Sequence, residues 1–214
     1  MTAPTPQIKR PVNKEGRQYR KSQATKQLIL ETAVSCFVEY GYHQTTALKI
    51  AELSGLSRGA MRHHFVSKID ITRAAIDYLY EKRLQAFREA VTGIPANADR
   101  IIFAVEAFWA QVNHPRYMAF FELSVASRTD PQLAEVLRPA EEAFNKTYME
   151  MAAELFPEWS EHPDTLRLAL NLARYLLEGM AVDLVARESV EAQDVLHLLE
   201  RQLRDLRDRP HLRG

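Results

Sequence analysis

The segment from Arg58 to His64 contains two arginines and two histidines within seven residues. An arginine guanidinium can donate paired hydrogen bonds to O6 and N7 of a guanine base. Gly59 and Ala60 are small, so the backbone of this segment can approach a partner closely. These residue types favour hydrogen bonding to nucleic acid, with Arg62 and His63 as further polar contacts.

A metal site is the alternative for two neighbouring histidines. Pairs of histidine ligands on a helix are usually four residues apart, whereas His63 and His64 are adjacent. We therefore expect no metal and no cofactor here, and we expect His64 to pack more than His63.

Local signals place this segment on the second of two short helices. Thr46 is a suitable N-cap for the first helix, and Ser57 for the second. Between them runs a short turn that contains Gly55. Helices this short need a shared core, for which the sequence offers Phe37, Ile50, Ala51, Leu56, Met61 and Phe65. Two short helices joined by a glycine-containing turn indicate a helix-turn-helix, whose second helix enters the DNA major groove.

The rest of the chain predicts an all-α fold. Further helices are expected at 22–40, ending before Gly41, and at 67–91, 98–113, 116–127, 131–156, 163–187 and 190–208. Residues 1–21 have three prolines and few apolar side chains, so we expect a disordered basic tail. We expect a DNA-binding domain at 22–69. The 67–91 helix then joins it to a larger effector-binding and dimerisation domain at 70–214.

Charge is distributed unevenly, although the formal net charge is +0. Residues 1–70 contain eleven Lys and Arg against five Asp and Glu, and the remainder contains seventeen against twenty-three. A basic head on an acidic body indicates that the head meets a polyanion. The rival class is a helical ligand-binding or scaffold protein that does not touch DNA.

Other classes lose support from absent motifs. The sequence has no phosphate-binding glycine loop, nucleophile elbow or zinc-protease motif, so we expect no enzyme. Its single cysteine, Cys36, lies on an apolar helix face and rules out an internal disulfide. This fits a reducing cytoplasm, where the DNA lies in the nucleoid. No apolar run is long enough to span a membrane.

A longer pattern carries a family resemblance. It comprises Ile29, Leu30, Ala33, Cys36, Phe37, Gly41, Tyr42, Thr45, Thr46, Ile50, Ala51, Ser54-Gly55-Leu56-Ser57-Arg58-Gly59-Ala60-Met61, His63, His64, Phe65, Ser67 and Lys68. This segment resembles the N-terminal domain of TetR-family regulators. The resemblance implies an all-helical homodimer that binds double-stranded operator DNA and responds to a small-molecule effector. It also implies DNA contacts at Thr45, Thr46, Ser57, Arg58, Gly59, Ala60, His63 and Lys68.

One position departs from the family pattern. Arg62 stands where members usually have a tyrosine that contacts a phosphate. Arginine either keeps that contact or reaches a guanine. We expect a repressor that an effector releases from a palindromic operator, with an activator as the alternative. The basic tail is expected to enter an adjacent minor groove.

The last two predicted helices are the expected dimer interface, because the 163–187 helix is apolar around more than half its circumference. The residues predicted for this interface are Leu170, Ala173, Leu177, Met180, Leu184, Leu196, Leu199 and Leu203. A purely intramolecular core is the alternative.

Aromatic residues in the middle of the body suggest an apolar effector pocket. The predicted lining residues are Phe108, Trp109, Phe121, Glu122, Tyr148 and Tyr175. The shortage of cationic side chains expected to face inward favours a neutral or cationic effector.

Overall fold

The structure is a computed structural model that describes residues 14–95, 98–186 and 192–209. Within these ranges the chain is helical and contains no strand. The elements are α1 (Lys14–Gln44), α2 (Ala47–Leu53), α3 (Arg58–His64), α4 (Lys68–Thr92), α5 (Arg100–Val112), α6 (Tyr117–Ser127), α7 (Pro131–Leu155), the 3-10 turn η1 (Pro157–Trp159), α8 (Pro163–Ala186) and α9 (Ala192–Asp208). The predicted all-α class is therefore confirmed.

The short helices begin where their N-caps predict. The Thr46 hydroxyl oxygen accepts the amide hydrogen of Lys49, and the Ser57 hydroxyl oxygen accepts that of Ala60. Ser67 forms a full capping box at the start of α4, because its hydroxyl and the Asp70 carboxylate each accept the other's backbone amide. These local hydrogen bonds fix the starts of α2, α3 and α4.

Helix α1 is longer than predicted. It begins at Lys14, eight residues before the expected start, so residues 14–21 are helical rather than tail. Lysine, arginine and glutamine are good helix formers, and Pro11 is the last proline before this stretch. Residues 1–13 of the predicted tail lie outside the described residues.

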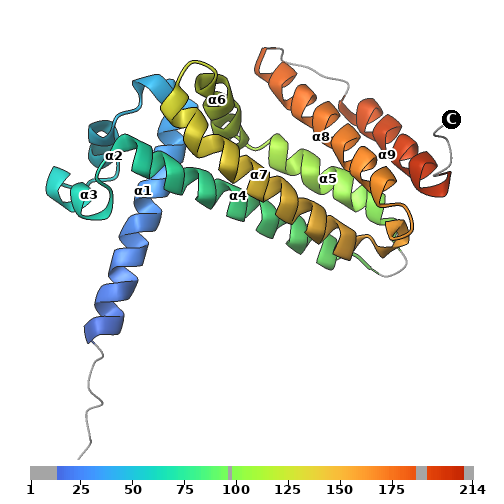
Figure 1. The fold of residues 1–214 in the computed structure, drawn as a ribbon, viewed down its shortest axis with the longest axis horizontal. Coiled ribbons are helices and arrows are strands. Elements are labelled where there is room, and N and C mark those ends of the chain that lie inside the picture. The colour runs from blue at the N-terminus through green and yellow to red at the C-terminus, as the bar shows by residue number, and fades with distance from the viewer. Residues whose placement is uncertain (1–13, 96–97, 187–191, 210–214) are drawn as a thin grey trace, which may run out of the picture.

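The helix-turn-helix and the larger body share one continuous core. Phe37, Ile50, Ala51, Met61 and Phe65 are buried as predicted, while Leu56 is half-buried. Helix α4 connects this core to the body, where it packs against α1, α5 and α7. In Figure 1, α2 and α3 lie at one end of the molecule and α8 and α9 at the other.

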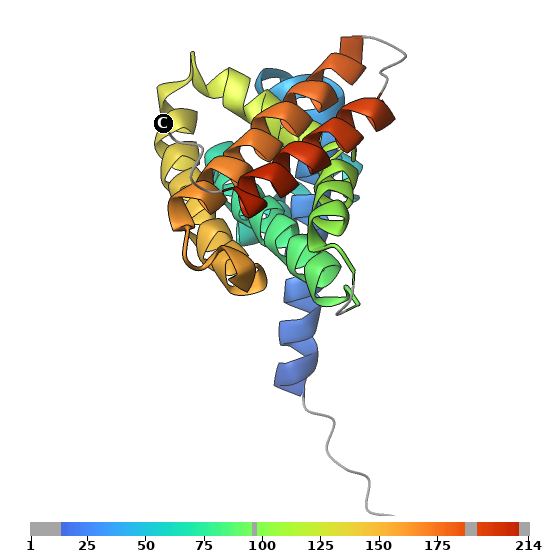
Figure 2. The same cartoon turned by 90° about the vertical axis from the view of Figure 1, so that its right-hand side faces the viewer.

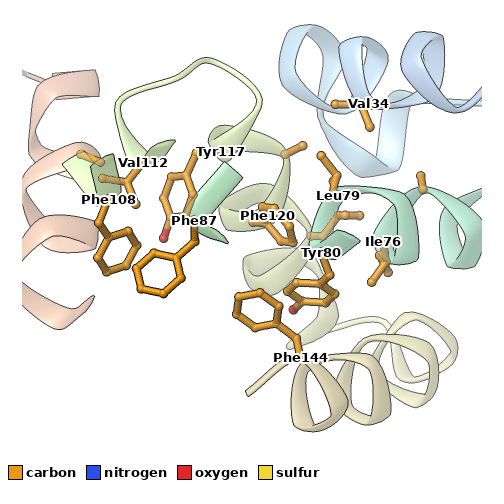
Figure 3. Close-up of a cluster of buried hydrophobic side chains, with 14 of the residues drawn as sticks. Val34, Ile76, Leu79, Tyr80, Phe87, Phe108, Val112, Tyr117, Phe120 and Phe144 are labelled. Carbon is orange, nitrogen blue, oxygen red and sulfur yellow. The ribbon is translucent and has the colours of Figure 1, made fainter. Parts of the chain in front are cut away.

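Aromatic rings fill the centre of the body. The Tyr80 ring of α4 lies 4.8 Å from the Phe120 ring and 4.6 Å from the Phe144 ring, measured between centroids. Figure 3 shows Tyr80 beside these two rings, with Phe87, Phe108 and Tyr117 farther along the body. Stacked and tilted ring pairs of this kind hold α4, α6 and α7 together.

Candidate nucleic-acid interface and ligand cavities

Helix α3 presents its predicted polar face to solvent. Met61 anchors the helix in the core, while Arg58, Gly59, Arg62 and His63 are exposed. A side-chain carbon added at Gly59 would meet only the Ser57 hydroxyl, at 4.0 Å, so the backbone there is open to a partner. His64 is half-buried, with its ring against that of His63.

The two threonines before α2 have different positions. Thr46 is exposed, and its hydroxyl oxygen caps α2. Thr45 is fully buried, and its hydroxyl donates to the carbonyl oxygens of Gly41 (2.8 Å) and Cys36 (3.1 Å). The Thr45 side chain therefore holds the end of α1 and does not reach the surface that Arg58 occupies.

Lys68 is also engaged inside the protein. Its ammonium donates to the Tyr42 carbonyl oxygen at 2.5 Å and lies 3.8 Å from the centroid of the Tyr42 ring. Burial lowers the pKa of this lysine, against the opposing effect of Asp130. Its main contact is therefore with the end of α1, although the side chain remains half-buried at the surface.

Tyr42 forms the joint between the helix-turn-helix and the body. The Glu122 carboxylate of α6 accepts the Tyr42 backbone amide hydrogen at 2.7 Å. Burial, together with the nearby Asp130 carboxylate, raises the pKa of the Tyr42 phenol to about 12. Glu122, predicted as a pocket residue, instead links α6 to the end of α1.

Gly41 makes this joint possible. Its backbone has φ 75° and ψ 165°, a conformation that is essentially restricted to glycine. A side-chain carbon at this position would lie 2.9 Å from a Glu122 carboxylate oxygen. The kink in α1 therefore requires glycine, and a larger residue would also displace the Glu122 carboxylate.

The first half of α1 projects from the body. Residues 17–28 are exposed except for the half-buried Thr25, and they contain four basic side chains. These are Arg17, Arg20, Lys21 and Lys26. Figures 1 and 2 show this part of α1 extending away from the other helices. We call residues 17–28 the arm.

Three hollows in the body bear on the predicted effector pocket. An apolar cavity of about 50 Å³ is lined by Phe108 and Tyr148, both predicted pocket residues. A cleft of about 370 Å³ lies between α4, α5 and α6. A third cavity, of about 180 Å³, lies between α4, α6, α7 and α8 and includes Phe121 in its lining.

The remaining pocket residues do not line these hollows. Trp109 is half-buried against the core, and Tyr175 is 64% exposed. The expectation that few cations face inward is also wrong. Arg83 lines both the cleft and the third cavity, and Arg174 lines the third cavity. Helical periodicity alone did not reveal that these two arginines lie among aromatic rings.

The residues predicted for the dimer interface face the inside of the chain. Leu177 and Leu199 are at most 1% exposed in the single chain. Ala173, Met180, Leu196 and Leu203 are also buried, and Leu170 and Leu184 are half-buried. These side chains join α8 and α9 to the body of their own chain.

The opposite face of α8 is apolar and exposed in the part of the chain that the structure describes. Leu168, Leu172, Tyr175 and Gly179 are exposed and follow one another at helical spacing. A side-chain carbon added at Gly179 would meet no atom within 4 Å. With the exposed Leu198 of α9, these residues form what we call the outer stripe. Figure 2 views the side of the molecule that α8 and α9 cover.

Other site chemistry finds little support. In residues 14–95, 98–186 and 192–209, no three His, Cys, Asp or Glu side chains gather as a metal site. Burial raises the pKa of the Cys36 thiol, which opposes a nucleophilic role. No helix in the described parts of the chain has the length and apolarity needed to cross a membrane.

Comparisons with known proteins agree with this geometry. Residues 29–75 match the family described as bacterial regulatory proteins, tetR family. The chain is 26% identical over 178 residues to the HTH-type transcriptional regulator UidR of Escherichia coli K12, covering 81% of this chain and 90% of UidR. It is 30% identical over 139 residues to the HTH-type transcriptional activator FasR of Mycolicibacterium smegmatis, covering 63% of this chain and 62% of FasR.

Solved structures share the fold. A crystal structure of a protein from Pseudomonas aeruginosa PAO1 superposes with a TM-score of 0.69 at 18% identity. The superposition covers 94% of this chain and 99% of the other chain. The likeness therefore extends through the body as well as the helix-turn-helix.

Proposed function

We propose that this chain, whose residues 29–75 match the bacterial regulatory proteins of the tetR family, is a homodimeric repressor of that family that a small-molecule effector releases from a palindromic operator. The observation that carries this proposal is the capped helix α3, which has Met61 in the core and a basic face in solvent. The proposed domains are residues 22–69 for DNA binding and 70–214 for effector binding and dimerisation. The proposed place of action is the nucleoid, in the cytoplasm.

Helix α3 supplies the proposed sequence reading. Arg58 is its first residue, and N-terminal side chains of a recognition helix meet base edges in the major groove. Arg62 and His63 lie one turn later on the exposed face. Gly59 and Ala60 allow the backbone to approach, while Ser57 and Thr46 keep hydroxyl hydrogens that can be donated to phosphates. Lys68 adds positive charge at the edge of this surface.

The arm extends the proposed DNA contact. An α-helix is about 10–12 Å across, and the minor groove is about 6 Å wide. The helical arm is therefore too wide for the minor-groove role expected of the tail. We assign it instead to the phosphate backbone beside the half-site, where its four basic side chains contribute without reading sequence.

The outer stripe is the proposed dimer contact in place of the buried residues. Pairing two copies across α8 and α9 gives a four-helix interface with twofold symmetry. Gly179 provides the close approach that such pairing needs. In the DNA-bound state the two α3 helices must be about 34–36 Å apart, or a multiple of this, to read a palindrome.

The joint at Tyr42 is the proposed route of release. Helix α4 begins with Lys68 at the joint and continues to the hollows around Arg83, fifteen residues later, or about 22 Å along the helix. If α4 can adopt two orientations, an effector that binds the protein more tightly in one of them shifts the dimer toward that orientation. A changed spacing of the α3 helices then weakens operator binding.

The first experiment is selection of DNA from a random pool by the purified protein, read by sequencing at physiological salt. We expect a palindrome with two matching half-sites. The matched control is Arg58→Ala, which we expect to lose enrichment at one base position in each half-site. Salt-sensitive bulk binding without an enriched sequence would refute specific regulation.

An activator is the second candidate, because FasR is named as an activator. The selected site separates the two candidates when it is placed before a reporter gene. A repressor lowers expression and an activator raises it. A site-scrambled promoter provides the control.

A further inference from the structure

Arg83 is a buried cation in an aromatic setting. Its side chain is 15% exposed. The guanidinium carbon lies 5.0 Å from the Phe144 ring centroid, 5.3 Å from that of Phe120, 5.5 Å from that of Tyr117 and 5.8 Å from that of Phe108. Aromatic rings attract a cation electrostatically, but they replace only part of its lost hydration.

Most N–H donors of the Arg83 guanidinium have no hydrogen-bond acceptor among the described residues. Arginine carries five N–H donors, and Arg83 donates through Nη2 to Oε1 of Glu178 at 3.4 Å. This distance is long for a charge-assisted hydrogen bond, which is usually about 2.7–2.9 Å. The buried Nε has no acceptor among the described residues. The guanidinium therefore has capacity for a second, better-placed anion.

Arg174 repeats the pattern in the third cavity. Its Nη1 donates to the Asn145 side-chain oxygen at 3.2 Å, and its buried Nε has no acceptor in the described parts of the chain. Glu178 and Glu141 also line this cavity, so two cations face two carboxylates. The third cavity is nearly balanced in charge and offers less to an anion than the cleft.

The cleft between α4, α5 and α6 is strongly cationic at its polar groups. Lys82, Arg83 and Arg116 line it, with His114 and Gln111. Among the described residues of this lining there is no aspartate or glutamate. Four small side chains line its apolar part, which are Ala86, Ala90, Ala107 and Ala110. The larger Leu79, Tyr117 and Phe120 complete the apolar lining. Small residues leave room, and about 370 Å³ lies within the range for small-molecule sites.

We propose that the effector is a small organic carboxylate whose carboxylate pairs with Arg83 and whose apolar body lies in this cleft. The planar guanidinium matches a carboxylate through paired hydrogen bonds. Glu178 remains 3.4 Å from Arg83 and disfavours a second negative charge there, so the anion carries a single charge. This inference rests on the proposed effector-released function and gives its ligand a chemical class.

The test uses straight-chain and phenyl-terminated alkanoates, each matched with the amide and the primary amine of the same length. Binding to the full-length protein is measured by calorimetry. We expect the carboxylate that fits best to bind at least about tenfold more tightly than its amide, and the amine to bind weakest. Arg83→Gln is expected to remove the preference for carboxylate over amide.

Two controls accompany this variant. Arg88→Gln changes the same charge on an exposed residue of the same helix and is expected to keep the preference. Binding of the selected operator without ligand reports that Arg83→Gln is folded. Equal affinity for carboxylates and amides, preference for amines, or no binding by any carboxylate would each overturn the proposal.

Operator release, measured in the same samples, distinguishes the proposed carboxylate site from the proposed release by an effector. A carboxylate that binds through Arg83 but leaves the operator occupied supports the site and refutes effector release. Release by an amine or a neutral compound, unchanged in Arg83→Gln, supports effector release and refutes the carboxylate.

Discussion

The chain carries cations in two opposite settings. On α3 and the arm, Arg58, Arg62 and Arg17 are exposed to solvent. In the body, Arg83 is buried among four rings, with one long contact to a carboxylate. Exposed cations suit a polyanion that approaches from solvent and brings many phosphates. A buried guanidinium suits one small anion, since a duplex cannot enter the body.

Solvent screening provides the practical difference between these settings. At 0.1 M salt, interactions between exposed charges are largely screened beyond about 10 Å, whereas interactions between buried charges are screened much less. The two proposed binding events should therefore respond differently to ionic strength.

The largest effect that we predict is this difference in salt dependence. Operator affinity should fall about a thousandfold or more between roughly 50 and 200 mM salt, as for proteins that make several phosphate contacts. Carboxylate affinity should change by about fourfold at most, as expected for one charge contact over the same range. Fluorescence anisotropy for the operator and calorimetry for the carboxylate measure the two slopes. Equally steep slopes would mean that the carboxylate binds exposed cations rather than Arg83.

The joint between the two settings gives the next largest effect. Gly41→Ala should lower the free energy of unfolding by about 3 kcal/mol, because its backbone conformation excludes other residues. The added carbon would also approach Glu122 closely. Urea unfolding measures the loss. The matched control is Gly93→Ala, whose φ of −79° suits alanine and whose added carbon makes an ordinary 3.5 Å contact.

A second variant divides this effect into its two causes. Because Glu122→Ala also removes the hydrogen bond to the Tyr42 amide, Gly41→Ala is made in the Glu122→Ala background, where its cost should fall to the backbone strain alone. No loss in Gly41→Ala would show that the end of α1 has another low-energy conformation, and the joint would then not be rigid.

These two regions also differed in how far the sequence predicted them. The caps at Thr46, Ser57 and Ser67 depend on residues three positions away, so local pattern was enough to place α2, α3 and the start of α4. The resemblance indicated the polar face of α3. Thr45 was the exception, because burial at the end of α1 overrode the family pattern.

In the body, periodicity predicted helices but not their inward faces. Helix α8 is apolar on two sides, and only tertiary packing decides that Leu177 faces inward and Leu172 outward. Arg83 bonds to Glu178, which is 95 positions away in the sequence, and Glu122 bonds to Tyr42, which is 80 positions away. No local signal reports such distant partners, which is why the cations of the body were missed.

The exposed setting is tested by Arg58→Ala. We expect a loss of about 2 kcal/mol on the preferred operator and relaxed specificity at one base position, as for an arginine that bonds to guanine. Competition assays with single-base operator variants measure both. Arg88→Ala, on the exposed far part of α4, is the control and should leave operator affinity unchanged. Equal weakening on all sequences would show that Arg58 contacts only phosphate.

Partly exposed arginines form a third setting between these two, and the expected change in the free energy of unfolding is smaller there. Arg204 and Arg207 of α9 are partly exposed, and both face Asp99, the N-cap of α5, at 2.6 and 3.8 Å. Burial opposes ionisation of Asp99, but hydrogen bonds from Arg204 and the Ile101 amide hold its pKa below the usual value for an aspartate. Because the folded pKa is depressed, this stabilisation is present above the unfolded pKa and disappears as pH falls through the folded pKa.

We therefore expect Asp99→Asn, which keeps a capping residue but removes the charge, to lose about 1 kcal/mol at neutral pH. The loss should shrink as the solution is acidified, which urea unfolding across the acid range will measure. A double-mutant cycle with Arg204→Gln should assign most of it to this pair. The same cycle for Arg83 and Glu178 should give a smaller coupling, since their contact is 3.4 Å rather than 2.6 Å. A larger coupling would make Arg83 a structural cation already satisfied by Glu178, and the contrast with the exposed cations would lose its functional meaning.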